Sequence, residues 1–174
     1  WMLAHNILYT YIAPFVAPAG LADRVDLVLL VFGIAALAGI WLTAKLVEPL
    51  LRKTVLVSLA TFALVCVVFG FFGRMPQVIY LGVLVWGLSF GGAATLLQTA
   101  LADAAGDGAD VALSLNVVAW NSAIAGSGVV GGVLLDRWGV ASFPWAMVVL
   151  VGVGFAMAWW ARVHGFRPGA RGAR

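Results

Sequence analysis

The side chains in this sequence that could bind a solute are amides and aromatics within long apolar stretches. Residues 112–135 carry no charged side chain, yet they include Asn116, Trp120, Asn121 and Ser122. A stretch of this length exceeds the ~20 helical residues that are needed to cross the hydrocarbon core of a bilayer. An amide at that depth is costly unless it faces protein or a water-filled cavity. The pattern therefore predicts a helix that forms one wall of a polar pathway, and it disfavours a plain hydrophobic anchor.

A second polar face is predicted within residues 1–19. Asn6 and Tyr9 share one side at helical spacing, and Tyr11 follows closely. Pro14 lies inside the same stretch and predicts a kink, because proline removes a backbone hydrogen bond. Two interpretations of the face stay open. It looks into the pathway, or its tyrosines hydrogen-bond a neighbouring helix, as buried tyrosines usually do.

The stretch 78–102 combines one amide with closely spaced glycines. Gln98 lies near its end, where it is either a pathway residue or a helix end in contact with water. Glycines four residues apart let two helix backbones approach closely, and two such pairs occur within the predicted spans, together with a stripe of small residues. The glycines expected to pack helices are Gly39, Gly87, Gly91, Gly128 and Gly132.

The segment from Gly87 to Gly91 also matches the G-x-S-x-G pattern of serine hydrolases, with Ser89 at its centre. That pattern works when the serine lies on a sharp turn between a strand and a helix, and here it lies in an unbroken apolar run. An intramembrane serine protease would have to use His5 as its base. We expect Ser89 instead to hydrogen-bond its own helix backbone.

Titratable groups are scarce at membrane depth. The acidic residues all lie at the ends of the apolar stretches or between them: Asp23, Asp26, Glu48, Asp103, Asp107, Asp110 and Asp136. Proton coupling needs an ionisable group within the membrane, and His5 is the one candidate here. The spacing of the acids matches no calcium loop, and Cys66 is the single cysteine, so no metal or cofactor is expected.

The composition places the chain in a membrane. Hydrophobic residues make up 64% of it and charged residues 10%, against about 25% charged residues in typical soluble domains. The mean hydropathy is +1.07. The net charge of +3 comes from basic residues at the ends of the apolar stretches, which is a membrane-orientation signal and not a nucleic-acid site.

Six membrane-spanning helices are expected within a bundle that covers residues 1–162. Their approximate bounds are 1–19, 25–46, 55–72, 78–102, 111–135 and 143–161. The third and sixth spans carry few polar groups, so we expect them to face lipid. One side of the membrane then collects Lys45, Arg52, Lys53, Arg162, Arg167, Arg171 and Arg174, and the other collects Arg24, Arg74 and Arg137. This imbalance predicts a cytoplasmic C-terminus, with residues 163–174 as a disordered basic tail.

Spans one to three and spans four to six show a loosely similar pattern. In each set the first span has a polar or glycine-rich face, the second ends in a charged turn, and the third is plain. Three helices per repeat invert its orientation, so the pattern predicts a 3+3 inverted repeat in an all-α membrane protein. The charges at the two turns are Lys45, Glu48, Arg52, Asp136 and Arg137.

With these features, the chain resembles the C-terminal half, helices seven to twelve, of a major facilitator superfamily transporter. The similarity is greatest to drug:proton antiporters of the arabinose-efflux-permease-like group. It rests on Tyr9-Thr10-Tyr11-Ile12-Ala13-Pro14-Phe15, Leu115-Asn116-Val117-Val118-Ala119-Trp120-Asn121 and Gly131-Gly132-Val133-Leu134-Leu135-Asp136-Arg137-Trp138-Gly139. The loop after the second span resembles a degenerate gating motif of the family, in which Ala44 and Leu51 replace glycines and Pro49 replaces a basic residue.

The resemblance implies transport of a small solute by alternating access, with proton-coupled efflux of a drug, sugar or nucleoside. It implies an inner-membrane protein whose other six helices are missing from this chain, with protons and a solute as partners. The residues implied to line the cavity are Asn6, Tyr9, Tyr11, Gln98, Trp120 and Asn121. A non-transporting membrane scaffold subunit is the alternative.

Overall fold

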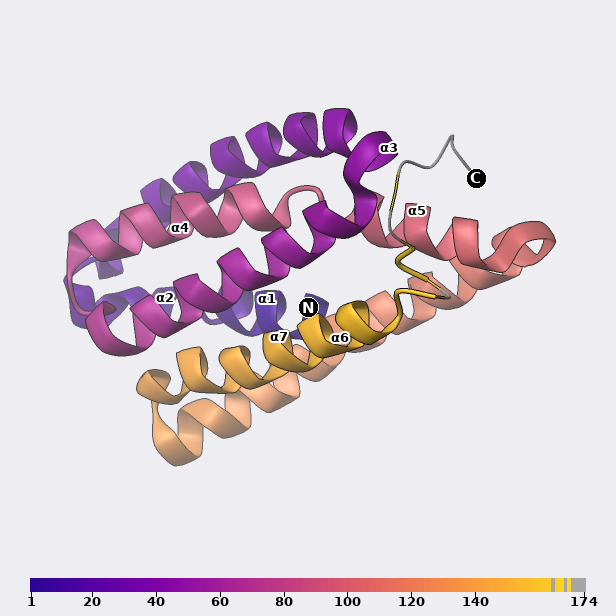
Figure 1. The fold of residues 1–174 in the computed structure, drawn as a ribbon. Coiled ribbons are helices and arrows are strands. Elements are labelled where there is room, and N and C mark those ends of the chain that lie inside the picture. Colours follow the sequence, from indigo (N-terminus) through magenta and orange to yellow (C-terminus); the bar gives the residue numbers. More distant parts are fainter. Residues whose placement is uncertain (164, 168, 170–174) are drawn as a thin grey trace.

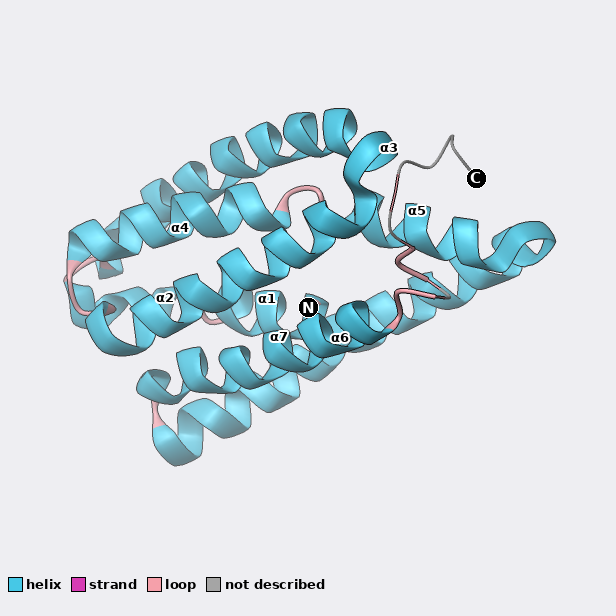
Figure 2. Ribbon diagram, in the orientation of Figure 1, coloured by secondary structure: helices cyan, strands magenta, loops and turns pink. Residues whose placement is uncertain are grey.

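The computed structural model describes residues 1–163, 165–167 and 169, and every regular element in this part of the chain is a helix (Figure 2). The predicted all-helical fold is therefore confirmed. The α-helices are α1 (Met2–Thr10), α2 (Ile12–Val16), α3 (Val25–Phe72), α4 (Pro76–Phe90), α5 (Ala93–Ala105), α6 (Ala109–Trp138) and α7 (Phe143–Trp160). Short 3₁₀ turns η1 to η4 span Ala17–Ala19, Ala22–Arg24, Gly106–Gly108 and Val140–Ser142.

In the described part of the chain, three helical stretches are long and apolar enough to cross a membrane. They cover residues 22–72, 76–138 and 140–160, with lengths of 51, 63 and 21 residues. A continuous helix of the first length would extend to about 75 Å, more than twice the ~30 Å thickness of a hydrocarbon core. Both longer stretches must therefore change direction, and Figure 1 shows that the chain turns back within α3 and again between α5 and α6.

The turn inside α3 occurs at one residue, Leu50, whose φ of −138° and ψ of 27° are not helical. Pro49 stands directly before it, where its ring cannot supply the backbone N–H that a continuous helix uses. The sequence predicts a loop of several residues between the second and third spans. The structure corrects this: the helix resumes at once, and Thr54 Oγ1 donates to the carbonyl of Leu50 at 3.0 Å.

The predicted kink in the first apolar stretch is present, three residues before the proline. α1 ends at Thr10, and Tyr11 has a φ of −107° and a ψ of 28°. The ring of Pro14 clashes with the carbonyl four residues earlier, on Thr10, so the helix has to open at this point. The break sets the direction of the Tyr11 side chain.

The fourth predicted span is also broken, whereas the sequence predicts one continuous helix over residues 78–102. Gly91 and Gly92 separate α4 from α5, and Gly92 has a φ of −87° and a ψ of 1°. Two adjacent glycines cost helix stability, since each has more freedom to lose than an alanine. The pair instead permits a close approach to the first half of α3, where an added Cβ on Gly92 would collide with Thr43.

The bundle centre is aromatic. Trp86 on α4 is fully buried, and its ring lies 4.3 Å from that of Phe32 and 6.3 Å from that of Phe62. α3 packs against α4 and α7, and α1 packs against α6 and α7. In a membrane, such contacts stabilise the fold through close van der Waals packing, because lipid tails are as apolar as the side chains.

The predicted tail, residues 163–174, is described only in part. Residues 164, 168 and 170–174, which include two of its arginines, lie outside the described residues. The remaining part begins directly after α7, where Gly165 and Phe166 both donate their N–H groups to the carbonyl of Ala161 at 3.0 and 2.9 Å. This stretch thus turns back on the end of the helix.

Candidate functional site

The surface of α6 carries the most notable uncovered polar group. Among its thirty residues, Ser127 and Gly131 are the buried ones, so neighbouring helices cover little of α6. Asn121 lies on the exposed side, and its Nδ2 donates to the carbonyl of Val117 one turn earlier, at 2.9 Å. Because that bond stays within the helix, the Oδ1 atom of Asn121 is left to face outward.

Two other predicted pathway residues are exposed on helices that contact α6. Gln98 lies on α5, and within the described part of the chain its amide makes no hydrogen bond. Tyr9 lies on α1 and is 44% exposed. The polar groups Tyr9, Gln98 and Asn121 therefore come from α6 and from two helices that pack against it, and all three side chains are exposed. We refer to these three residues as the exposed polar face.

Trp120 and Asn116 occupy a different position on α6. Both are half-buried, and they line a cavity of about 310 Å³ together with Trp1, Leu97 and Met157. This volume lies within the range of small-molecule sites, about 300–1,000 Å³. Asn116 and Asn121 thus lie on different sides of α6, as expected for residues five positions apart on a helix.

Tyr11 lies between helices. Its hydroxyl donates to the carbonyl of Gly128 on α6 at 2.6 Å, and its ring meets Phe143 of α7 edge-on, with 5.7 Å between centroids. A Cβ on Gly131 would collide with the Tyr11 ring. Of the two interpretations for the tyrosines, the structure favours the interhelical bond for Tyr11 and exposure for Tyr9.

Replacing Tyr11 by phenylalanine removes one interhelical hydrogen bond and keeps the ring packing. We expect the free energy of unfolding to fall by about 0.6–1.7 kcal/mol, which runs from the average to the largest value for interhelical hydrogen bonds in a membrane protein. Thermal unfolding in detergent measures the change. The matched control is Tyr80→Phe, since Tyr80 has a buried hydroxyl with no hydrogen-bond partner. A Tyr11→Phe protein as stable as the control would contradict the assignment.

Asn6 and His5 lie inside the bundle. Asn6 is buried, and its Nδ2 donates to the carbonyl of Met2 on its own helix at 3.0 Å. The His5 ring stacks on Phe90 with 3.6 Å between centroids and an angle of 5° between planes. Trp86 and Tyr9 are also near His5, at 5.2 and 5.5 Å. His5 therefore packs as one ring in an aromatic cluster.

The glycines differ in what surrounds them. A Cβ on Gly39 would collide with the carbonyl oxygen of Leu88. A Cβ on Gly91 would collide with the carbonyl oxygen of Ala36. A Cβ on Gly87 would lie 2.5 Å from the carbonyl oxygen of Phe32. These three glycines bring α3 and the α4–α5 region into backbone contact. A Cβ on Gly132 would lie 3.1 Å from the Tyr11 hydroxyl. A Cβ on Gly128 would meet nothing within 4 Å, so the contribution of Gly128 is its carbonyl.

Arg52, predicted as a gating charge, holds the end of α7. Its guanidinium donates to the carbonyls of Ala158 and Phe166 at 2.9 Å and of Trp159 at 3.0 Å. These groups are at the C-terminal end of a helix, where the backbone carries partial negative charge and its last carbonyls lack helical partners. Nothing in the sequence pairs Arg52 with residues more than a hundred positions away.

The other predicted gating charges lie at the surface. The ammonium of Lys45 is 3.9 Å from the centroid of the Trp41 ring, a cation–π contact. Glu48, Asp136 and Arg137 are exposed. Among the described residues, Asp136 and Arg137 make no ion pair with each other. The charged turn that ends α6 is therefore open to contact.

Ser89 does not have the geometry of a nucleophile. Its Oγ donates to the carbonyl of Trp86, one turn earlier, at 3.0 Å, and Ser89 is buried within α4. His5 packs against the neighbouring Phe90 through ring stacking. Ser89 thus hydrogen-bonds its own helix backbone, as the sequence predicts. Within the described residues, no group of three or more histidine, cysteine or acidic side chains could hold a metal ion.

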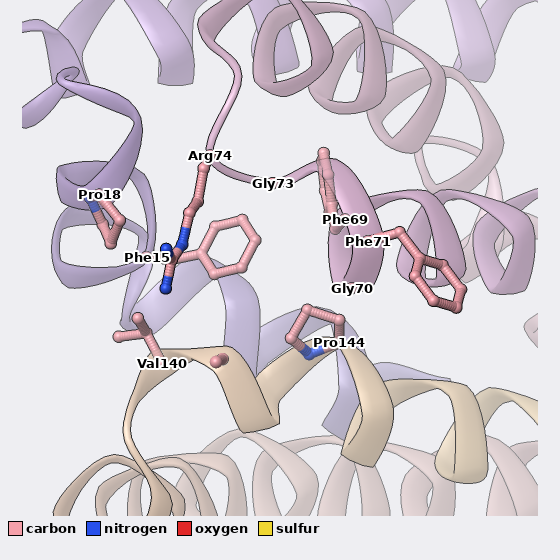
Figure 3. Close-up of a pocket in the computed structure, with 10 residues that line it drawn as sticks. Phe15, Pro18, Phe69, Gly70, Phe71, Gly73, Arg74, Val140 and Pro144 are labelled. Atoms are coloured by element: carbon pink, nitrogen blue, oxygen red, sulfur yellow. The ribbon is translucent and has the colours of Figure 1, made fainter.

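A smaller cavity lies at the opposite end of the bundle from Leu50. It is lined by the end of α3 together with η1, η4 and the start of α7, and its volume is about 120 Å³. Figure 3 shows the guanidinium of Arg74 pointing toward this cavity beside Phe15. The volume is well below the ~300 Å³ of the smallest typical small-molecule sites. We therefore do not assign the solute to this end.

Comparison with known proteins finds similar transporters. The chain is 28% identical over 151 residues to a probable sugar efflux transporter of Mannheimia succiniciproducens, covering 84% of this chain and 38% of that protein. It is 27% identical over 140 residues to a probable sugar efflux transporter of Helicobacter pylori G27, covering 78% of this chain and 35% of that protein. It is 27% identical over 141 residues to an uncharacterized MFS-type transporter of Bacillus subtilis, covering 80% of this chain and 35% of that protein.

The chain thus spans a little over a third of the length of the curated relatives it matches. No family model and no solved structure matches it. The relatives confirm the resemblance to major facilitator superfamily transporters, and with the apolar helices they support a multi-pass membrane protein. The chain is therefore similar to part of a transporter of the MFS type.

Proposed function

We propose that this chain forms one half of a transporter that moves a small polar solute by alternating access. The observation that carries the proposal is the exposed polar face of Tyr9, Gln98 and Asn121, on α6 and on the two helices, α1 and α5, that pack against it. A polar group at membrane depth is retained when it faces water or a second protein surface. A transport cavity between two halves supplies both of these.

The proposed architecture has six spans arranged as a 3+3 inverted repeat. The breaks at Leu50 and at Gly106–Gly108 divide the two long helical stretches into four spans, and α7 with the α1–α2 region supplies the others. The curated relatives are more than twice as long as the matched region, which supports a second half outside this chain. The positive-inside rule puts Lys53 and the C-terminus in the cytoplasm, in an inner membrane.

The proposed solute is neutral and polar, and the direction is efflux. The exposed polar face offers two amides and a phenol, which hydrogen-bond hydroxyl groups, and it carries no charged side chain. Two of the relatives are named as probable sugar efflux transporters, so sugars are the first solutes to test. If transport is coupled to protons, we expect the coupling group in the other half, since the acidic residues of this chain lie at the ends of the apolar stretches or between them, and His5 packs within an aromatic cluster.

Replacing Asn121 by leucine in the complete protein tests the proposal. The amide of Asn121 bonds only its own helix and is exposed, so the change should leave the melting temperature unaltered. Losing a hydrogen bond to the solute costs about 1–3 kcal/mol, and tenfold corresponds to about 1.4 kcal/mol. We therefore expect sugar efflux from loaded vesicles to slow about tenfold.

The matched control is Val149→Leu, which also creates an exposed leucine but lies on α7, away from the exposed polar face. Val149→Leu should transport like the unmodified protein. Equal efflux by both variants would contradict a pathway role for Asn121. If the unmodified complete protein moves no sugar, nucleoside or drug in either direction, the scaffold alternative takes precedence.

A further inference from the structure

A groove runs along the side of the bundle between α4 and the two halves of α3. One part is a cavity of about 370 Å³, and a second cavity of about 230 Å³ continues it. Thr61 and Val85 line both cavities, so the two form one continuous groove. Every lining residue belongs to α3 or α4, whereas the exposed polar face lies on α1, α5 and α6. The groove is therefore separate from the proposed pathway.

The walls of the groove suit a hydrocarbon chain. Its rims are apolar and open, with Val57, Leu64 and Leu81 exposed by 64%, 63% and 65%. Val65 is buried and contributes to the floor. Ser89 also contributes, but its hydroxyl already donates to its own helix. A guest with hydrogen-bonding groups along its length would gain little here, and a row of methylene groups would gain close contact.

The groove is longer than the hydrocarbon depth of one lipid leaflet. It extends along α3 from Lys53 to Val68, which is about 22 Å at the helical rise per residue. Half of a hydrocarbon core is ~15 Å. An acyl chain that enters beside Lys53 therefore has an apolar wall along its whole length.

One cation stands at the mouth of the groove. Lys53 is exposed and lines the wider cavity, where its stem can lie on apolar surface while its ammonium reaches the headgroup region. The neighbouring cations are engaged elsewhere, because Arg52 binds the end of α7 and Lys45 lies over Trp41. The groove thus combines an apolar trough with a single positive charge at one end.

We propose that this groove binds one anionic phospholipid, with an acyl chain between α4 and the second half of α3 and the phosphate beside Lys53. A basic side chain near a membrane surface favours anionic lipid by an amount that corresponds to about fivefold in affinity. The unmodified protein should therefore retain phosphatidylglycerol about fivefold more strongly than phosphatidylcholine with the same acyl chains.

Native mass spectrometry of the complete protein, purified in neutral detergent and mixed with each lipid, tests the proposal. Lys53→Gln should abolish the preference for phosphatidylglycerol, whereas Lys45→Gln should preserve it. Thr61→Phe fills the middle of the groove and should reduce retention of both lipids. Val149→Phe, a bulky change on exposed α7, should not.

The outcomes separate cleanly. Equal retention of the two lipids by the unmodified protein, or an unchanged preference in Lys53→Gln, overturns the proposal. Unchanged retention in a folded Thr61→Phe protein overturns the position of the acyl chain. If Thr61→Phe does not fold, the comparison of the two lysine variants decides alone. Lipid retention is measured without transport, so a failure here leaves the proposed function standing, and the reverse also holds.

Discussion

Replacing Gly91 by alanine is expected to lower the free energy of unfolding by about 2 kcal/mol, within the range for overpacked cores. The added Cβ would lie 2.8 Å from both the carbonyl carbon and the Cα of Ala36, and closer still to the carbonyl oxygen. These are backbone atoms of α3, so no side chain can rotate away. The φ of −51° and ψ of −37° at Gly91 suit alanine, so the expected loss comes from the collision between helices alone.

Gly33→Ala is the matched control, since Gly33 lies in α3 and a Cβ there would meet nothing within 4 Å. Alanine is favoured over glycine in helices by about 1 kcal/mol, so this variant should be as stable as the unmodified protein or more so. Thermal unfolding in detergent compares the two. Equal stability of both variants would show that α3 and the α4–α5 region do not pack backbone to backbone.

Replacing Arg52 by alanine is expected to destabilise the bundle by about 2–3 kcal/mol, since hydrogen bonds from a charged group contribute most strongly. The change leaves the carbonyls of Ala158, Trp159 and Phe166 without the guanidinium that now binds them. It also removes a positive charge from the C-terminal end of α7. Arg52→Lys should recover only part of the loss, because one ammonium cannot reproduce the planar fork of donors.

Arg162→Ala serves as the control for the Arg52 variants. Arg162 is an exposed arginine in the same region and makes no hydrogen bond within the described residues. Its replacement should leave thermal unfolding unchanged. Hydrogen exchange of α7 gives a second measurement: faster exchange near Trp159 is expected in Arg52→Ala and not in Arg162→Ala. Unaltered exchange in Arg52→Ala would contradict the role assigned to this side chain.

The helical fold was predictable because composition and length leave a long apolar chain with few other choices. The kink near Pro14 was predictable for a similar reason, since proline acts on its own helix. The turn at Leu50 was harder to predict. Pro49 indicates the region of the turn, but packing between helices decides how many residues adopt non-helical backbone angles. The break at Gly91 and Gly92 depends on contacts with α3, which local sequence does not contain.

The candidate site was predictable as a set of residue types and not as a geometry. Amides and tyrosines within apolar stretches can be read directly, but their partners cannot. Asn6 and Asn121 both bond their own helix, yet one is buried and the other exposed. Tyr9 and Tyr11 point to different surroundings because the helix opens between them. The role of Arg52 depends on residues distant in sequence, so no local pattern could indicate it.

Thiol labelling of Asn121→Cys in the complete protein, in sealed vesicles of both orientations, tests most directly whether a water-accessible pathway lies beside α6. Cys66 is buried in the core, so background labelling within this chain should be low. A pathway role for Asn121 predicts that a hydrophilic, membrane-impermeant reagent modifies Asn121→Cys and leaves Val149→Cys, on the exposed surface of α7, unmodified. A transported sugar should slow the reaction at Asn121→Cys. Inertness of this residue from both sides of the membrane would contradict a water-accessible pathway beside α6.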